Sequence, residues 1–299
     1  MGNSSSNSVA VNSRPQVPDT WSASDIPSQS GKLVVITGAN SGIGYQAALE
    51  LARKGADVVL ACRSEARGKQ AEQRLRDALA SSPGAGTVKF MLLDVSDLSS
   101  VKRFAQEFNA THHRLDLLIN NAGVMAVPYA KTVDGYERQF ATNHLGHFAL
   151  TAQLFPLLKA SAPSRVVNTS SIAHKDATLA RFVSGGGVMH TDAKGYGSVR
   201  VYAESKLCNL LFTFELGRRV RDQKLIPLRQ DVPMGTLPTL YAATGADVES
   251  GDYYGASRLW EIRGPPKRVE ALAIAHDETT AKNLWDESER LANVKFDVQ

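Results

Sequence analysis

Cysteine is scarce in this sequence: Cys62 and Cys208 are the two present among 299 residues. Both lie in apolar stretches, the first typical of a strand and the second of a helix, so we interpret them as buried thiols. Two such cysteines do not indicate a disulfide framework, which suits a reducing compartment. We therefore expect the protein to be cytoplasmic.

Long apolar runs and an excess of charge are also lacking. The longest mostly apolar stretch, residues 148–158, is too short to cross a bilayer as a helix. The formal net charge is only +4 and no long basic run occurs, which argues against nucleic acid as a partner. With 43% apolar residues, the chain can still bury a sizeable core as one large α/β domain.

A set of metal ligands is lacking too. His144 and His147 are three residues apart in a helical pattern, but no further ligand set surrounds them in the sequence. We interpret them as ordinary histidines on a helix face and predict no metal site.

The first 30 residues have no apolar periodicity and are rich in serine, asparagine and proline. This composition predicts a disordered tail over residues 1–30, ahead of a single domain over residues 31–299. The tail has no positively charged segment followed by an apolar one, so we predict no signal peptide.

The tail begins Met-Gly-Asn-Ser-Ser-Ser, a pattern typical of N-myristoylation with Gly2 as the acceptor. The alternative is a flexible leader without lipid. A single acyl chain anchors a protein only reversibly, and Arg14 is the tail's only basic residue. An acylated protein would therefore associate weakly with the cytosolic face of a membrane.

Strand-like and helix-like patterns alternate from residue 31 onward. Strands are predicted over 33–37, 56–61, 87–93, 115–119 and 165–169, and helices over 65–80, 98–109, 136–159 and 201–221. Such alternation predicts a doubly wound parallel sheet of the Rossmann type, with helices on both faces. Ligands of such sheets bind at the carboxyl ends of the strands, so functional residues are expected directly after each strand.

A glycine-rich turn follows the first predicted strand and leads straight into a helical pattern. Glycines there let the backbone approach a pyrophosphate, and the free N–H groups and dipole of the helix favour the anion. The alternative is an ordinary tight turn, because the spacing Gly-x-x-x-Gly-x-Gly differs from the commoner dinucleotide fingerprint. The candidate cofactor-binding residues of this turn are Gly38, Asn40, Ser41, Gly42, Ile43 and Gly44.

Arg63 directly follows the second strand, where an acidic residue would bind the ribose 2′-hydroxyl of NAD. A guanidinium at this position can instead bind a 2′-phosphate, with Ser64 beside it, which favours NADP(H) over NAD(H). The alternative is a solvated surface arginine.

Small and acidic residues follow the next two strands. Asp94, with Val95 beside it, is placed to accept a hydrogen bond from the adenine amino group. Alternatively, Asp94 is the N-cap of the next helix, a position for which Ser96 and Asp97 are also candidates. After the fourth strand, a bend of small residues lets the backbone approach the cofactor. Its candidate residues are Asn121, Ala122 and Gly123.

Tyr202 and Lys206 lie four residues apart in a helical pattern and so share one face. An ammonium close to a phenol favours the phenolate, and such a tyrosine can exchange a proton with an alcohol or carbonyl at working pH. Alone, this pair is a weak signal, because i,i+4 pairs recur by chance.

Taken in order, these motifs resemble those of the short-chain dehydrogenases/reductases over most of residues 31–224. The matching motifs are residues 37–44, Asp94, residues 120–123, Asn143 within Thr-Asn-His-Leu-Gly, Ser171, and Tyr202 with Lys206. The segments 61–63, 122–125 and 206–210 resemble the retinol dehydrogenase and protochlorophyllide reductase branch.

This resemblance implies an NADP-dependent oxidoreductase that transfers a hydride between nicotinamide and a lipophilic alcohol or carbonyl compound. It implies that Tyr202 is the general acid/base and that Lys206 binds the nicotinamide ribose. Asn143 would support a proton-relay water, and Ser171 would hold the reacting oxygen. We choose Ser171 over Ser170 because the serine of the family precedes an aliphatic residue, here Ile172. A homodimer is among the assemblies that the sequence leaves open.

The interval 173–200 separates the serine from the tyrosine and contains three consecutive glycines at 185–187. A loop of mixed polarity beside a catalytic pair suggests a wall of the substrate pocket. A plain surface insertion is the alternative.

The sequence departs from the family after residue 224, where a sixth parallel strand and a Pro-Gly turn are expected. Residues 225–228 are too few for that strand, and Pro227 cannot donate a hydrogen bond within a central strand. A helical pattern at 235–243 and a strand near 252–255 follow almost at once. We therefore predict a sheet without the sixth strand. This prediction gives two alternatives to an active oxidoreductase: a cofactor-binding protein impaired in catalysis, or a truncated gene product that folds poorly.

If Gly2 carries a myristoyl group, Gly2→Ala shifts the protein from the membrane fraction to the soluble fraction, because the acylation pattern requires glycine at this position. Fractionation of cells that express each form measures the shift. Identical distribution of the two forms would show that the tail is only a flexible leader.

Overall fold

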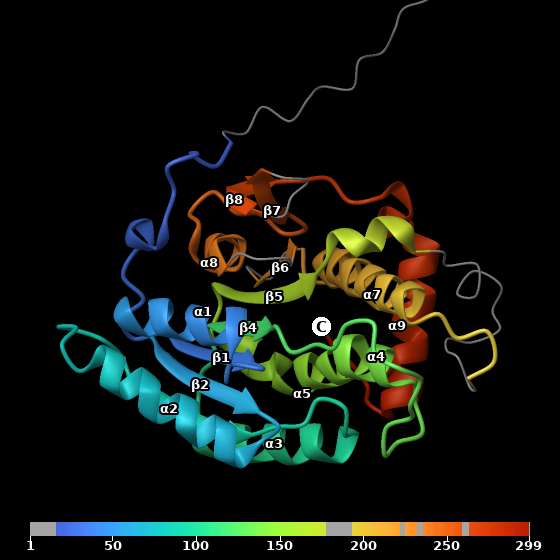
Figure 1. Ribbon diagram of the computed structural model, residues 1–299, viewed down its shortest axis with the longest axis horizontal. Helices are drawn as coiled ribbons and strands as arrows, with labels where there is room; N and C mark the ends of the chain where they lie inside the picture. The colour runs from blue at the N-terminus through green and yellow to red at the C-terminus, as the bar shows by residue number, and fades with distance from the viewer. Residues whose placement is uncertain (1–15, 178–192, 222–224, 232–235, 259–262, 299) are drawn as a thin grey trace, which may run out of the picture.

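The computed structural model describes residues 16–177, 193–221, 225–231, 236–258 and 263–298, and a twisted sheet runs through the middle of the molecule (Figure 1). The strand order is β3-β2-β1-β4-β5-β6-β7-β8. The strands are β1 Leu33–Thr37, β2 Asp57–Cys62, β3 Val88–Leu92, β4 Leu117–Asn120, β5 Ser164–Ser170, β6 Leu225–Asp231, β7 Tyr253–Arg258 and β8 Arg263–Arg268. All pair in parallel except β8, which runs antiparallel to β7.

Helices cover both faces of this sheet (Figure 1). The helices are α1 Gly42–Arg53, α2 Glu65–Leu79, α3 Leu98–Thr111, α4 Arg138–Phe140, α5 Gly146–Ala160, α7 Ser198–Arg219, α8 Thr236–Thr244 and α9 Glu278–Ala292. Connections between parallel strands pass through these helices, as doubly wound sheets require. The predicted α/β fold of the Rossmann type is therefore confirmed.

Two apolar clusters fill the space between the sheet and its helices. One contains buried residues of α1, α2 and α8, and the other contains those of α3, α5, α7 and α9. Successive side chains of β1 point to opposite faces, so Val34 and Ile36 join the first cluster while Val35 joins the second. A strand buried on both faces is therefore apolar throughout, as this one is.

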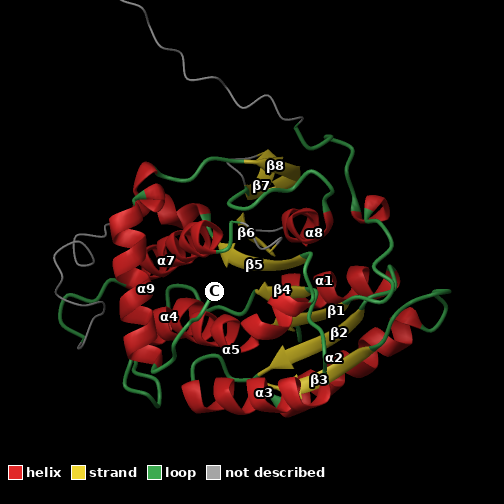
Figure 2. Ribbon diagram, turned by 180° about the vertical axis from the view of Figure 1, so that it is seen from behind, coloured by secondary structure: helices red, strands yellow, loops and turns green. Residues whose placement is uncertain are grey.

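The predicted absence of the sixth strand is wrong. β6 pairs in parallel with β5 along its whole length, from Ser164 opposite Leu225 to Ser170 opposite Asp231. On its other side, β6 pairs with β7 through Arg229 and Gln230. Pro227 lies opposite Val166 within the β5 ladder, two residues before the pairing with β7 begins, so a proline is accommodated in this strand. β5 is therefore an interior strand of the sheet, with β4 on one side and β6 on the other (Figure 2). The Pro-Gly turn expected after the sixth strand would fall in residues 232–235, which lie outside the described residues.

The prediction of a disordered tail over residues 1–30 is wrong for residues 16–30. From residue 16 the chain packs on the domain: Val17 and Ile26 are buried, and the Trp21 ring meets the Tyr241 ring of α8 edge-on at 5.0 Å. These apolar residues are spaced irregularly among serines and prolines, so no periodic pattern revealed them. Gly2 and the rest of residues 1–15 lie outside the described residues.

Both cysteines are free and buried. Among the described residues, none of the helices has the length and apolar character that crossing a membrane requires.

The C-terminal helix α9 packs on α7, the helix that carries Tyr202 and Lys206. Trp285 of α9 is only 2% exposed. Its ring lies 5.1 Å from that of Phe148 and 4.6 Å from that of Phe296, and the Arg219 guanidinium of α7 lies 4.2 Å from its centre. This aromatic cluster fixes α7 from the side opposite the sheet.

We expect Trp285→Ala to lower the free energy of unfolding by about 3–5 kcal/mol, because it empties a closely packed core position. Urea denaturation followed by circular dichroism measures the loss. Lys282→Ala on the exposed face of the same helix is the control, and equal destabilisation by the two variants would contradict the packing described.

Candidate cofactor and active site

A cavity of about 340 Å³ opens at the carboxyl ends of β1 to β4. This is where a doubly wound sheet binds its ligands. The residues that line it are Gly38, Asn40, Ser41, Ala61, Arg63, Ser64, Arg67, Leu93, Asp94, Val95, Asn121, Ala122, Gly123, Val124 and Thr142. Most of the predicted cofactor-binding residues are thus brought together. Five residues predicted to bind the cofactor do not line this cavity: Gly42, Ile43, Gly44, Tyr202 and Lys206.

The glycine turn has the backbone geometry that only glycine adopts readily. Gly38 and Gly42 have φ of +67° and +56°. A Cβ on Gly42 would meet nothing within 4 Å, whereas one on Gly44 would lie 2.6 Å from Nδ2 of Asn121. Gly42 therefore leaves open space above the turn, and Gly44 allows α1 to pack against the bend after β4.

The N-terminus of α1 is available to an anion. Ser41 is the N-cap residue, but its side chain makes no capping hydrogen bond. The first N–H groups of a helix have no partner within the helix and carry its positive partial charge. Together with the open position at Gly42, this geometry fits a pyrophosphate.

The other end of the cavity is basic. The Arg63 side chain is 65% exposed, and its Nε lies 4.0 Å from Oδ2 of Asp94. Ser64 caps α2 by accepting a hydrogen bond from the Arg67 N–H at 3.4 Å, and Arg67 itself lines the cavity. Sequence analysis missed Arg67. The sequence feature that could have identified Arg67 is a cation in the first turn of a helix, where the dipole disfavours positive charge unless an anion binds there.

Asp94 does not cap the following helix. Oδ1 of Asp94 accepts hydrogen bonds from the backbone N–H and hydroxyl of Ser96. The N-cap of α3 is Asp97, whose carboxylate accepts from the N–H groups of Ser99 and Ser100. Asp94 is thereby held at the cavity wall, and its contact with adenine stays a prediction.

Asn143 lies in a short π-helix, η2 Ala141–Leu145, between α4 and α5. Its Oδ1 accepts from the Val124 N–H at 2.8 Å, and its Nδ2 donates to Val124 O and to Oγ of Ser205, both at 2.9 Å. Both amide hydrogens are therefore bonded within the protein. The amide holds the segment after β4 against α7, and the predicted water relay stays untested.

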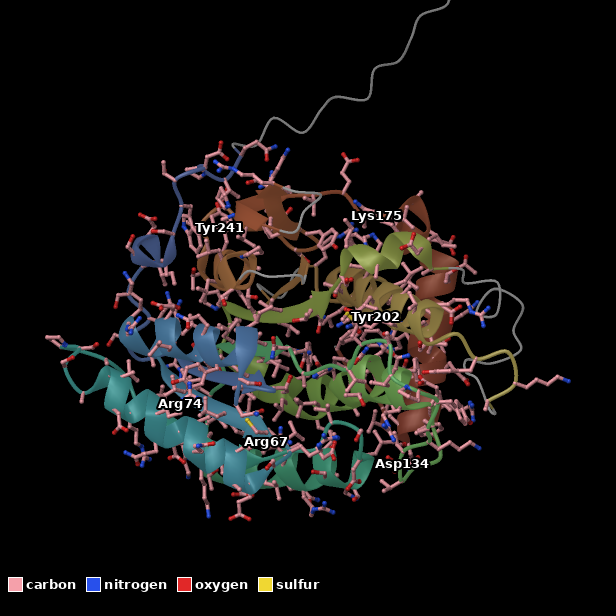
Figure 3. All side chains as sticks on the ribbon, in the orientation of Figure 1. Arg67, Arg74, Asp134, Lys175, Tyr202 and Tyr241 are labelled. Atoms are coloured by element: carbon pink, nitrogen blue, oxygen red, sulfur yellow. The ribbon has the colours of Figure 1, made fainter. Side chains whose placement is uncertain are left out.

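Tyr202 and Lys206 lie one turn apart on α7 and are 7% and 4% exposed. Nζ of Lys206 lies 5.6 Å from the centre of the Tyr202 ring and donates to Thr169 O at 3.2 Å. A Cβ on Gly123 would lie 3.6 Å from the same Nζ, so the lysine borders the end of the cavity. Figure 3 shows Tyr202 on α7 in the middle of the molecule.

The two serines after β5 have different surroundings. Ser170 is fully buried, and its hydroxyl donates to Lys206 O at 2.9 Å. Ser171 is the N-cap of the 3₁₀ turn η3 Ile172–Asp176, and its Oγ accepts from the Ala173 N–H. Ser170 thus ties β5 to α7, and Ser171 remains the candidate for the reacting oxygen. Residues 178–192 of the predicted pocket wall lie outside the described residues.

His144 and His147 are buried rather than exposed on a helix face. Burial lowers the pKa of His144 to about 3 and that of His147 to about 4, so both are neutral near pH 7. His144 bonds Ser288 of α9, and His147 bonds Thr37 at the end of β1. Within the described residues, no three or more His, Cys, Asp or Glu gather as metal ligands.

Comparison with known proteins agrees with this geometry. The family model described as short chain dehydrogenase matches residues 32–183. Mouse retinol dehydrogenase 12 is 39% identical over 298 aligned residues, which cover 89% of this chain and 88% of that protein. Human retinol dehydrogenase 14 is 38% identical over 87% of this chain and 85% of its own length.

A solved structure extends the similarity to the whole fold. An uncharacterized protein from Mycobacterium paratuberculosis is 39% identical, with a TM-score of 0.79 over 93% of this chain and 99% of that one. The match includes the part of the sheet beyond β5, where the sequence had suggested a gap. The chain therefore belongs to the short-chain dehydrogenase family, in its retinol dehydrogenase-like branch of NAD(P)-dependent oxidoreductases.

Proposed function

We propose that this chain is an NADP(H)-dependent oxidoreductase acting on a lipophilic alcohol or carbonyl compound. The observation that carries the proposal is the buried Tyr202–Lys206 pair of α7, whose ammonium borders Gly123 at the end of the cavity. The names of the relatives support the substrate class, because retinol is a lipophilic alcohol.

The residues of the cavity fit an NADP molecule. The turn from Gly38 to Gly44 and the N-terminus of α1 would hold the pyrophosphate. Arg63 and Arg67 would bind the 2′-phosphate, and Lys206 the nicotinamide ribose. When bound, the nicotinamide supplies or accepts the hydride.

In this proposal, side chains of the protein transfer the proton to and from the substrate oxygen. The Tyr202 hydroxyl gives a proton to the substrate oxygen during reduction and takes it back during oxidation. The Lys206 ammonium favours the phenolate form, and the Ser171 hydroxyl holds the substrate oxygen beside the tyrosine. Asn143 contributes through position, because its amide fixes Val124 and reaches α7 through Ser205.

The alternatives of an impaired binding protein and of a truncated product both depended on a missing strand. β6 fills that place and pairs on both sides, so we favour an active enzyme. Weak membrane association through Gly2, a cytoplasmic location and a homodimer stay predictions.

Arg63→Asp should weaken NADPH binding by about 10- to 100-fold, because it replaces a charge-assisted hydrogen bond to the 2′-phosphate with repulsion. NADH affinity should be retained or improved, since a carboxylate accepts from a 2′-hydroxyl. Fluorescence titration with each cofactor measures the change. Arg74→Ala is the control, because Arg74 lies on α2 over the Tyr45 ring and away from the cavity (Figure 3). An unchanged ratio of the two affinities would remove Arg63 from the cofactor site.

Tyr202→Phe should lower NADPH-dependent reduction of lipophilic aldehydes by about 10²- to 10⁴-fold, because the proton donor is lost. NADPH affinity should stay within about twofold of that of the native chain, since the phenol does not line the cavity. Tyr196→Phe is the matched control: the Tyr196 hydroxyl bonds Glu137 and Gln139 instead.

Three outcomes of this assay separate the hypotheses. Loss with Tyr202→Phe alone supports the proposed role. Full activity of Tyr202→Phe would refute the role of the tyrosine. Tight NADPH binding by the native chain without any aldehyde turnover would instead support the binding-only alternative.

A further inference from the structure

His147 of α5 is a buried polar side chain, and both of its ring nitrogens have partners. The side chain is 2% exposed. Nε2 lies 2.9 Å from Oγ1 of Thr37, and Nδ1 lies 3.1 Å from the backbone oxygen of Asn143. Burying an imidazole costs free energy unless such bonds are made, so the pair of contacts requires an explanation.

The direction of the bond between Thr37 and His147 follows from the other partners of the threonine. Oγ1 of Thr37 accepts from the N–H groups of Asn121 and Ala122, both at 2.9 Å. A hydroxyl oxygen has two acceptor positions and one hydrogen, so this hydroxyl must donate onward. Nε2 of His147 at 2.9 Å is a far better acceptor than Ile119 O at 3.5 Å. Nε2 therefore carries no proton.

The contact of the other ring nitrogen, Nδ1, independently indicates the same tautomer. A carbonyl oxygen only accepts hydrogen bonds, so Nδ1 of His147 must donate its proton to Asn143 O. Burial keeps the ring neutral by lowering its pKa to about 4. The tautomer of His147 is thus fixed from both sides as the Nδ1–H form.

These bonds join the two halves of the candidate site. At one end, Thr37 holds the bend after β4 that lines the cavity. At the other end, Asn143 bonds Ser205, whose hydroxyl donates to Tyr202 O at 2.7 Å. Every bond in this series has a fixed direction, and His147 is its middle member.

We propose that His147 is a positioning residue that couples the bend at Asn121–Ala122 to Asn143 and, through Ser205, to Tyr202. The proposal rests on the proposed oxidoreductase function for its effect on rate, but the network itself is independent of that function. A small displacement of a catalytic group is costly, since about 1 Å can lower a rate about 100-fold.

The first experiment tests the network without any activity. The full chain is labelled with ¹⁵N-histidine, and the His147 signals are assigned by their loss in His147→Phe. We expect a protonated Nδ1 and an unprotonated Nε2, with no titration between pH 5.5 and 7.5, because the pKa of about 4 lies well below this range. A proton on Nε2, or titration near pH 6.5, would overturn the proposal.

The second experiment separates positioning from stability with a matched histidine. His144 is 1% exposed, lies three residues away and bonds Ser288 of α9. His147→Phe and His144→Phe should both lower the melting temperature. Only His147→Phe should lower kcat by about tenfold or more at a nearly unchanged KM, because misplacement of the reacting groups affects kcat. Equal kcat values for the two variants would show that His147 is merely structural.

Variants of Thr37 test the same hydrogen bond without changing His147, so they remain informative if His147→Phe folds poorly. Thr37→Val removes the hydroxyl and should reproduce the loss in kcat, while Thr37→Ser keeps the hydroxyl and should retain kcat. The double variant Thr37→Val with His147→Phe should be little worse than either alone, because both break one network. Losses that multiply would overturn the coupling. If the native chain shows no turnover, the proposed function fails, while the histidine spectrum still decides the network.

Discussion

The contact between α7 and the carboxyl end of β5 fixes both candidate catalytic side chains. Thr169 O accepts from Nζ of Lys206 and from Nδ2 of Asn209, and the Ser170 hydroxyl donates to Lys206 O. The helix is thus bonded to the strand by side chains on both sides rather than by apolar packing alone. Because these groups are buried, each bond is costly to lose, and α7 is held in one register along the strand. The position of Tyr202 depends on that register.

Buried polar groups are concentrated around this contact, and the aromatic cluster of α9 lies on its outer side. Apolar packing tolerates small shifts, whereas hydrogen bonds between buried groups weaken steeply with distance and angle. The molecule therefore combines two kinds of constraint. Trp285 and its neighbours supply stability, and the amides and hydroxyls of Asn143, Ser205 and Asn209 supply precise placement.

The fold and much of the cavity could be predicted because they depend on local sequence. The glycine turn and the residues after each strand are set by backbone conformation and by the alternation of strands and helices. β6 could not be predicted, because its segment Leu-Ile-Pro-Leu-Arg-Gln-Asp has no strand pattern and is stabilised by pairing with β5 and β7. His147 was misjudged for a similar reason, since its partner Thr37 is 110 residues away. Arg67 was missed although the helix predicted over 65–80 already placed it in a first turn, because the sequence does not show that the cavity extends to that turn.

The start of α2 has an electrostatic consequence for the protein without its ligand. Arg63 and Arg67 lie beside the positive end of the helix dipole. The carboxylate of Glu65 in the same turn pairs with Lys69, and that of Asp94 lies 4.0 Å from Nε of Arg63. Charges of one sign at a helix terminus cost about 0.3–1 kcal/mol each at low ionic strength. A small dianion would relieve this repulsion, so we expect inorganic phosphate or sulfate in a buffer to compete with the 2′-phosphate of the proposed cofactor. We therefore expect cofactor affinities to depend on the anion of the buffer as well as on its ionic strength.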